Sequence, residues 1–148
     1  MEAYDTLPAG RVLAVEVVGD PGGGVIGDLV AHRLSRIGMF GAVVDGPIRD
    51  VTGILRSEFP VWARAITLGG MSASELRIEK GREINLGGVP VREGDFLSAG
   101  PDGICVVKTD YTEGVFQAAE AIKRAEEEAH RRIAAGSTIL EAYPSIRQ

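Results

Sequence analysis

Hydrophobic and polar positions follow two different periods in the first half of the chain. Short runs rich in β-branched residues, such as Val12–Val18, predict strands, and a stretch beginning near Asp28 repeats its apolar residues at helical spacing until Gly38. The predicted elements, in chain order, are a mostly buried strand over 12–18, a helix from 28, a strand over 41–45 that Gly46 and Pro47 turn, a short helix over 50–57 and a strand over 60–66. Strands that alternate with helices in this way are typical of a parallel α/β sheet.

After Thr67 the pattern changes to shorter apolar runs separated by glycine-containing turns. From Arg82 to Lys108 the turns fall at 87–88, 93–95 and 100–103, which predicts antiparallel strands packed onto the parallel part. From about Thr112 to Ala135 helical spacing returns, and Gly136 supplies a stop. The predicted apolar face of this long helix consists of Val115, Ala118, Ala119, Ile122, Ala125, Ala129 and Ile133. We therefore predict the α/β class, as one domain over residues 1–148.

The composition indicates a soluble globular protein. The chain has 148 residues, of which 45% are hydrophobic and 25% are charged. Its net charge of -5 gives no reason to expect nucleic-acid binding, because polyanions are held mainly by basic surface. No apolar run approaches the roughly twenty residues of a membrane span, and the N-terminus has no signal-peptide pattern. We expect a cytoplasmic protein with no membrane partner.

The single cysteine, Cys105, lies in the apolar run Ile104–Val107 and has no second cysteine with which to form an internal disulfide. We expect it to be a buried strand thiol, as free cysteines in apolar runs generally are. A reactive nucleophile is the alternative interpretation.

The stretch from Gly27 to Asp50 contains the candidate chemistry. Asp28 stands at the start of the predicted helix, and Arg49–Asp50 follows the next strand after a gap of twenty residues, 29 to 48. In a parallel sheet each unit returns the chain to its starting end, so these residues are expected at one edge. Two carboxylates, an arginine and a helix N-terminus would suit a metal ion and a small anionic substrate. Taken singly, each aspartate could be a helix N-cap worth about 1 kcal/mol, and Arg49 with Asp50 a surface ion pair.

The loop before this helix also fits a dinucleotide-binding pattern. Gly22, Gly24 and Gly27 satisfy G-x-G-x-x-G between a strand and a helix, and Asp45 ends the next strand where a ribose-binding acid would stand. Residues 19–21 are inserted before the first glycine, which removes the tight turn. Asp28 would place a carboxylate where the pyrophosphate should bind. These features argue against a nucleotide site.

The spaced aspartate and Arg-Asp pair resemble another motif much more closely. They close the segment Gly38–Asp50, which reads Gly-Met-Phe-Gly-Ala-Val-Val-Asp-Gly-Pro-Ile-Arg-Asp and is similar to the RraA-like family. That family includes the class II 4-hydroxy-4-methyl-2-oxoglutarate/4-carboxy-4-hydroxy-2-oxoadipate aldolases. Supporting matches lie in Phe59–Arg64, Gly87–Asp95 and Asp102–Val107. The resemblance implies a swivelling β/β/α fold, a homo-oligomer (a trimer or a hexamer made of two trimers) and active sites between subunits.

Three departures from the family pattern bear on the interpretation. Members usually have a longer segment before Val12, so the chain looks like a short form, a fragment or a trimmed protein. Gly53 stands where some members carry an acid, and Gly100 where an aspartate is frequent.

The ribonuclease E regulators of the family generally lack the first aspartate of the spaced motif. The presence of Asp28 therefore favours the catalytic branch.

The resemblance and the chemistry together assign roles to these residues. A 4-hydroxy-2-oxo acid or oxaloacetate would be cleaved through the enolate of pyruvate, whose negative charge a divalent metal can stabilise. Asp50 is the expected ligand of Mg²⁺ or Mn²⁺. Arg49 is expected at the enolate oxygen, since its guanidinium is permanently charged and planar. Asp28 is expected to hold the water that moves the proton.

The substrate carboxylate is assigned to the start of the helix, where free backbone N–H groups bind anions. Gly27, Leu29 and Val30 form this predicted subsite, together with Arg49. The predicted protein is a metal-dependent lyase that acts on a small 2-oxo acid. The alternative is a non-catalytic regulator of ribonuclease E type that acts through protein–protein contacts.

Overall fold

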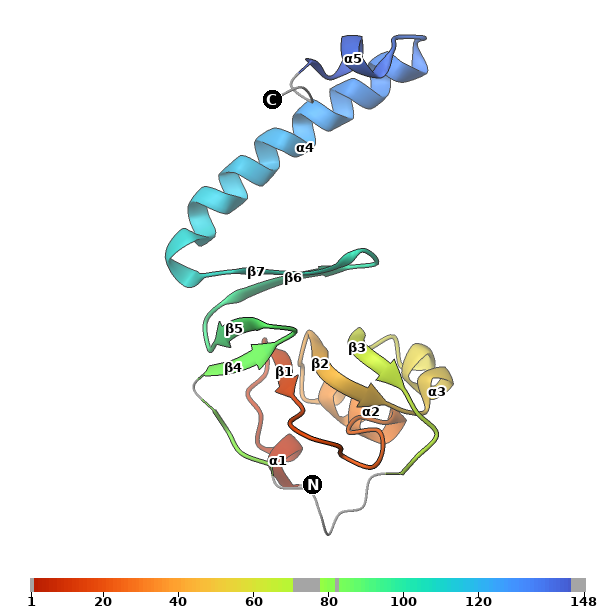
Figure 1. Cartoon of the computed structure of the whole chain (residues 1–148), viewed down its shortest axis with the longest axis vertical. Coiled ribbons are helices and arrows are strands. Elements are labelled where there is room, and N and C mark those ends of the chain that lie inside the picture. The colour runs from red at the N-terminus through yellow and green to blue at the C-terminus, as the bar shows by residue number, and fades with distance from the viewer. Residues whose placement is uncertain (1, 71–77, 82, 145–148) are drawn as a thin grey trace. The chain divides into compact units, whose positions relative to one another are not determined.

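The computed structural model describes residues 2–70, 78–81 and 83–144 (Figure 1). These residues form two compact units, one within residues 1–106 and the other within 107–148.

A three-stranded parallel sheet is the centre of the first unit. Its strands are β1 (Val12–Glu16), β2 (Gly41–Ile48) and β3 (Val61–Ile66), in the order β1-β2-β3. Both neighbouring pairs are parallel. Helix α2 (Asp28–Arg36) connects the first pair and helix α3 (Val51–Arg56) the second (Figure 1). The predicted parallel βαβαβ order is therefore confirmed.

Two of the predicted strands differ from the observed ones. We predicted that the second strand ends at Asp45, but β2 continues to Ile48, and the register is irregular between Val44 and Pro47. At such an irregularity a proline can lie in a strand, because its missing N–H is not required by the ladder. The first strand was predicted to be mostly buried. It is only half-buried, and Val12 and Glu16 are exposed, because β1 lies at the edge of its sheet.

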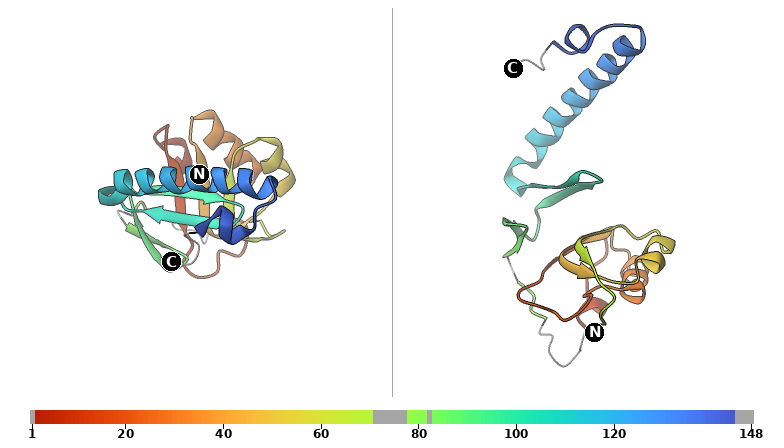
Figure 2. Two further views of the ribbon diagram at one scale, coloured as in Figure 1. Left: turned by 90° about the horizontal axis from the view of Figure 1, so that it is seen from above. Right: turned by 45° about the vertical axis from the view of Figure 1, so that its right-hand side comes forward.

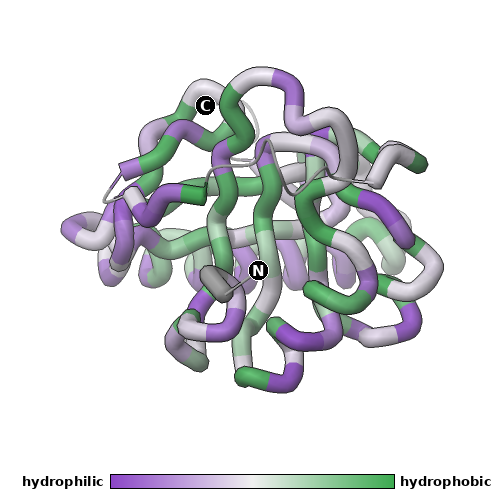
Figure 3. Tube along the Cα trace, turned by 90° about the horizontal axis from the view of Figure 1, so that it is seen from below, coloured by the Kyte–Doolittle hydropathy of each residue, from purple (hydrophilic) through white to green (hydrophobic). Residues whose placement is uncertain are grey.

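Helices α2 and α3 cover one face of the parallel sheet. Ala31 and Leu34 of α2 and Ile54 of α3 are buried there against Ala42 and Val44 of β2. Truncating a fully buried leucine such as Leu34 typically costs about 2–5 kcal/mol. Figure 3 shows hydrophobic residues gathered on the extended segments near the centre of the view. Gly38 follows the end of α2, as predicted, and its φ of +82° lies in the left-handed region.

The other face of the sheet packs against an antiparallel hairpin. Strands β4 (Glu83–Leu86) and β5 (Val89–Arg92) form this hairpin. Leu86 and Val91 are buried in a cluster with Val43 of β2. The predicted packing of antiparallel strands onto the parallel part is confirmed.

A second two-stranded sheet corrects our expectation for the cysteine. It pairs β6 (Phe96–Gly100) with β7 (Gly103–Val107), and the indole N–H of Trp62 donates to the carbonyl of Gly100 at 3.1 Å. Cys105 on β7 is exposed, not buried. Its sheet has only two strands among the described residues, so an apolar run in it does not become a core strand.

The second unit is helical. It contains the 3-10 turn η1 (Thr109–Tyr111), the long helix α4 (Thr112–Ala134) and the short helix α5 (Ile139–Ala142), which packs on the C-terminal part of α4 (Figure 2). Thr138 and Glu141 form a capping box at the start of α5. The predicted long helix is confirmed, but of its apolar face only Ala129 is buried. No helix in the described parts of the chain is long and apolar enough to span a membrane.

Candidate functional site

Two helix N-termini meet at the end of strand β2. The loop before α2 runs parallel to the last residues of β2, and an isolated bridge pairs Ile26 with Ile48. The N–H of Arg49 donates to the carbonyl of Ile26 at 3.0 Å, and the N–H of Val25 donates to the carbonyl of Pro47 at 2.9 Å. These bonds bring the predicted residues on the two segments together, as the parallel connection predicts.

The close approach of the two segments explains Gly24. A Cβ built on Gly24 would lie 2.7 Å from the backbone nitrogen of Arg49 and 2.9 Å from its Cβ. No side chain fits in that space. Gly24, one of the three glycines of the dinucleotide-like pattern, therefore allows one backbone to pack against another, and no phosphate is needed to explain it.

Asp50 has an unusual backbone conformation. It is the residue before α3, and its φ of 55° and ψ of 38° lie in the left-handed region. Such a conformation in a non-glycine residue costs about 1–3 kcal/mol and is frequent at functional sites, although aspartate tolerates it better than most residues. The N-cap interpretation does not hold for its side chain, which makes no capping hydrogen bond. The carboxylate is 39% exposed, and its Oδ2 lies 3.4 Å from Nε of Arg49.

Asp28 lies at the first position of α2 and is partly buried. Its Oδ1 accepts the N–H of Leu29 at 2.8 Å. The Leu29 donor assigned to the substrate carboxylate is thus occupied by a carboxylate of the chain itself. A substrate would have to displace Asp28 to use it, so the anion subsite at Leu29 and Val30 stays a prediction.

Asp45 has a structural role that the sequence did not reveal. One of its oxygens accepts the side chain of Arg64, and Oδ2 accepts the backbone N–H of Gly87 at 2.7 Å. The hydrogen bond from Arg64, followed by that from Gly87, lowers the pKa of the Asp45 carboxyl. Both oxygens are used within the fold, which removes the ribose-binding acid that a dinucleotide site would need.

The donor set fits a divalent cation bound through one carboxylate. Among the described residues, no group of three or more histidine, cysteine, aspartate or glutamate side chains is placed to hold a metal. Mg²⁺ commonly takes one or two protein carboxylates and completes its octahedron with water and substrate oxygens. Asp50 provides a half-exposed oxygen ligand that the backbone does not use. Asp50 therefore fits the predicted metal ligand.

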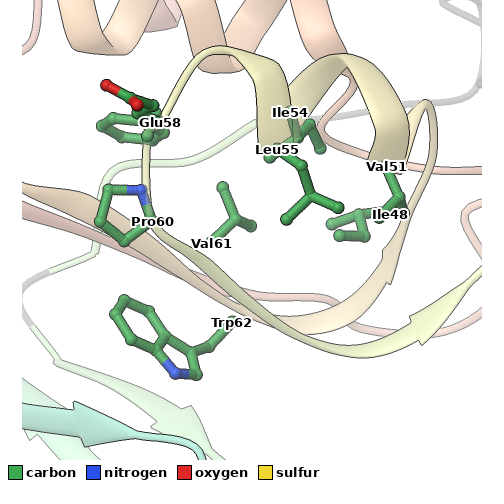
Figure 4. A pocket seen from close by; sticks show the side chains of 9 residues that line it. Ile48, Val51, Ile54, Leu55, Glu58, Pro60, Val61 and Trp62 are labelled. Carbon is green, nitrogen blue, oxygen red and sulfur yellow. The ribbon is translucent and has the colours of Figure 1, made fainter.

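Among the described residues of the first unit, two cavities are lined by neither Asp28 nor Arg49 nor Asp50. The larger, of about 310 Å³, lies between α3 and β3 (Figure 4). Its lining consists of Ile48, Val51, Ile54, Leu55, Glu58, Phe59, Pro60, Val61 and Trp62. With Glu58 as its only ionisable group, it is unsuited to an enolate. The second, of about 280 Å³, is lined in part by Asp45 and Arg64.

Comparison with known proteins identifies the family. The model of the RraA-like family, described as Aldolase/RraA, matches residues 1–106. The chain belongs to the RraA-like family. It is 33% identical over 129 residues to a Halalkalibacterium halodurans protein named "Putative 4-hydroxy-4-methyl-2-oxoglutarate aldolase". That match covers 87% of the chain and 60% of the relative, so this RraA-like chain spans less than two thirds of the relative's length.

Solved structures share the RraA-like fold. Streptomyces coelicolor RraAS2, described as an unusual member of the RNase ES inhibitor RraA protein family, aligns with a TM-score of 0.78 at 30% identity, over 88% of this chain and 67% of its own. A Pseudomonas syringae protein aligns with a TM-score of 0.87 over 97% of this chain and 68% of its own; at 24% identity it shows the fold alone. Names of both an aldolase and a ribonuclease inhibitor thus occur among the relatives of this RraA-like chain.

Proposed function

We propose that the chain carries the catalytic residues of a divalent-metal-dependent lyase of the class II pyruvate aldolase type. The observation that supports it is the meeting of Asp28, at the start of α2, with Arg49 and Asp50, before α3. The substrate would be a 4-hydroxy-2-oxo acid, oxaloacetate, or both. The aldolase name of the 33% identical relative supports the same class.

The reaction requires stabilisation of one developing negative charge. In aldol cleavage the hydroxyl proton is removed, the C3–C4 bond breaks, and its electron pair passes through C3 to the 2-oxo oxygen as the pyruvate enolate. The hydroxyl carbon becomes the carbonyl of the second product. Decarboxylation of oxaloacetate gives the same enolate with release of CO₂. Protonation at C3 then forms pyruvate in both cases.

Each residue of the site suits one part of this reaction. Asp50 would hold Mg²⁺ or Mn²⁺, which when bound supplies Lewis-acid stabilisation of the enolate charge. Arg49 is 43% exposed and permanently charged, so its planar guanidinium can bind the oxygen on which the charge accumulates. Asp28, partly buried beside them, would move the proton through a water molecule.

The site residues are partly exposed to solvent in a single chain. This exposure agrees with a site that a second copy of the chain completes. None of Asp28, Arg49 and Asp50 lines a described cavity, and Leu29 beside them is 78% exposed. An active site generally excludes water around a developing charge. This exposure supports the proposal that the working site is completed in a homo-oligomer; a trimer or a hexamer is what the family resemblance implies.

The test is release of pyruvate from oxaloacetate and from a 4-hydroxy-2-oxo acid, with and without Mg²⁺. Free divalent ions also decarboxylate oxaloacetate, so Asp50→Ala protein at the same Mg²⁺ concentration is the necessary control. We expect wild-type protein to exceed this control on at least one substrate. If the wild-type and Asp50→Ala proteins release pyruvate at equal rates on both substrates, the lyase is rejected. The ribonuclease-regulator alternative, which needs neither Asp28 nor Asp50, would then remain.

A further inference from the structure

Two glycines face the acids of the candidate site, each from the opposite helix. Gly27 precedes α2 and lies against Arg49 and Asp50. Gly53 is the third residue of α3 and lies against Asp28. The arrangement is therefore reciprocal: each helix start carries an acid and also a glycine that accommodates the acid of the other.

The contact at Gly53 leaves no room for a side chain. A Cβ built there would lie 2.5 Å from Cβ of Asp28 and 2.9 Å from its Oδ2. The first of these atoms is fixed to the backbone and cannot rotate away. Gly53 lies within a helix with no left-handed φ, so its backbone conformation does not require glycine. A glycine in a helix is normally less stable than alanine, and here the contact with Asp28 is what explains it.

The contact at Gly27 involves the ends of two side chains and no atom fixed to the backbone. A Cβ there would lie 2.8 Å from Oδ2 of Asp50 and 3.3 Å from Nε of Arg49. Gly27 has φ -122° and ψ -174°, an extended conformation that any residue can adopt. A side chain at Gly27 would therefore require the Asp50 carboxylate and the Arg49 guanidinium to move.

We propose that Gly27 and Gly53 are positioning residues that set the separation between Asp28 and the Arg49–Asp50 pair. Their catalytic consequence rests on the function proposed above, whereas the steric coupling does not. A side chain at Gly53 displaces Asp28, and a side chain at Gly27 displaces Asp50 and Arg49. The two glycines should therefore affect different functions: the proton step for Gly53, and metal binding for Gly27.

The steric coupling is tested by comparing two glycines at the same helical position. Gly114 is the third residue of α4, as Gly53 is of α3, and a Cβ there would meet nothing within 4 Å. We expect Gly114→Ala to raise the urea midpoint and Gly53→Ala to lower it. In an Asp28→Gly background, which removes the opposing side chain, Gly53→Ala should instead raise the midpoint. If Gly53→Ala stabilises the otherwise wild-type protein as Gly114→Ala does, the proposal is wrong.

Rescue keeps the test decisive if Gly53→Ala alone does not fold. The double variant Gly53→Ala/Asp28→Gly should then recover folding, and failure to recover would overturn the coupling. Neither measurement depends on pyruvate release, so an inactive wild-type protein would reject the lyase without affecting this result.

Metal binding and turnover separate the two glycines. Mn²⁺ titration followed by electron paramagnetic resonance should show weaker binding in Gly27→Ala and unchanged binding in Gly53→Ala. Turnover should fall in Gly53→Ala by about a hundredfold in kcat, the size expected when a catalytic group is misplaced by about 1 Å. Gly114→Ala should retain both properties. Equal loss of Mn²⁺ affinity in both site variants would contradict the assignment of one acid to each glycine.

Discussion

Glu16 and Asp45 are register partners on neighbouring strands, and each carboxylate accepts a backbone N–H of the β4–β5 hairpin. Glu16 Oε2 accepts from Asn85 at 2.9 Å, and Asp45 Oδ2 accepts from Gly87 at 2.7 Å. Arg64 from β3 donates to the other oxygen of Asp45. Glu16 at the end of β1 and Asp45 within β2 thus hold the hairpin on the sheet.

The first prediction concerns the acid dependence of this contact. The pKa of Asp45 is lowered in the folded protein, so its stabilisation is complete above the unfolded value of 3.8 and is lost as pH falls through the lower folded pKa. Asp45→Asn should cost roughly 1 kcal/mol at pH 7, because the amide has one acceptor oxygen for two donors that are themselves exposed to solvent. Urea unfolding at pH 7 and at pH 3 measures both effects.

The difference between wild type and Asp45→Asn should shrink at the lower pH. Asp102→Asn is the matched control, since Asp102 is exposed in the β6–β7 turn. It should change stability little at either pH. A difference for Asp45→Asn that does not depend on pH would show that the carboxylate charge is not what holds the hairpin.

The second prediction concerns metal removal. Because Asp50 is the one carboxylate assigned to the metal, the affinity of the protein for Mg²⁺ should be modest. Pyruvate release should therefore stop in excess EDTA. Adding Mg²⁺ or Mn²⁺ beyond the chelator should restore it. Pyruvate release before and after addition measures the effect. Undiminished turnover in EDTA would remove the metal from the mechanism.

Much of the parallel half could be predicted because each step is local. The change from strand period to helical period gives the βαβαβ order, and parallel connection then places Asp28 near Arg49–Asp50 without further information. The extension of β2 through Pro47 could not be predicted, since a register irregularity depends on how β3 pairs. A Gly-Pro pair reads as a turn unless the partner strand is known.

The exposures of Cys105 and of α4 could not be predicted either. An apolar run indicates that burial of its side chains would be favourable. It does not indicate whether another helix or strand is present to cover them. Gly53 shows the same limit in the site: its sequence signal is a glycine where a helix prefers alanine and where some family members carry an acid. That signal cannot identify Asp28 as the neighbour, because the contact joins residues on different helices.

The third prediction is self-association. Val115, Ile122 and Ile133 of α4 are exposed, and an apolar row of this kind on a long helix generally marks an interaction surface. Light scattering should give a multiple of 15.7 kDa, and Ile122→Lys should lower the measured mass. Gln117→Lys, on the opposite side of α4, should not. A folded monomer of 15.7 kDa in the wild type would contradict the prediction.

The last prediction separates the roles of Asp50, Arg49 and Asp28. Asp50→Ala should abolish turnover and weaken Mn²⁺ binding, because water replaces an anionic ligand. Arg49→Lys retains the charge but loses the planar two-point contact, so kcat should fall by about a hundredfold or more while Mn²⁺ affinity stays nearly unchanged. Asp28→Asn should slow the proton step and leave the binding of Mn²⁺ and of a pyruvate analogue largely intact.

Arg56→Lys provides the matched control for the arginine, since Arg56 is exposed in the last turn of the same helix that Asp50 precedes. It should keep wild-type kcat, KM and Mn²⁺ affinity. Nε of Arg49 lies 3.4 Å from the Asp50 carboxylate, so Arg49 could instead only support Asp50. A fall in kcat without a fall in Mn²⁺ affinity distinguishes an arginine that binds the enolate from one with that supporting role. An equal fall of Mn²⁺ affinity in the Asp50, Arg49 and Asp28 variants would therefore show that the three side chains act together on the metal. Full activity in all three variants would show that the reaction takes place at another site.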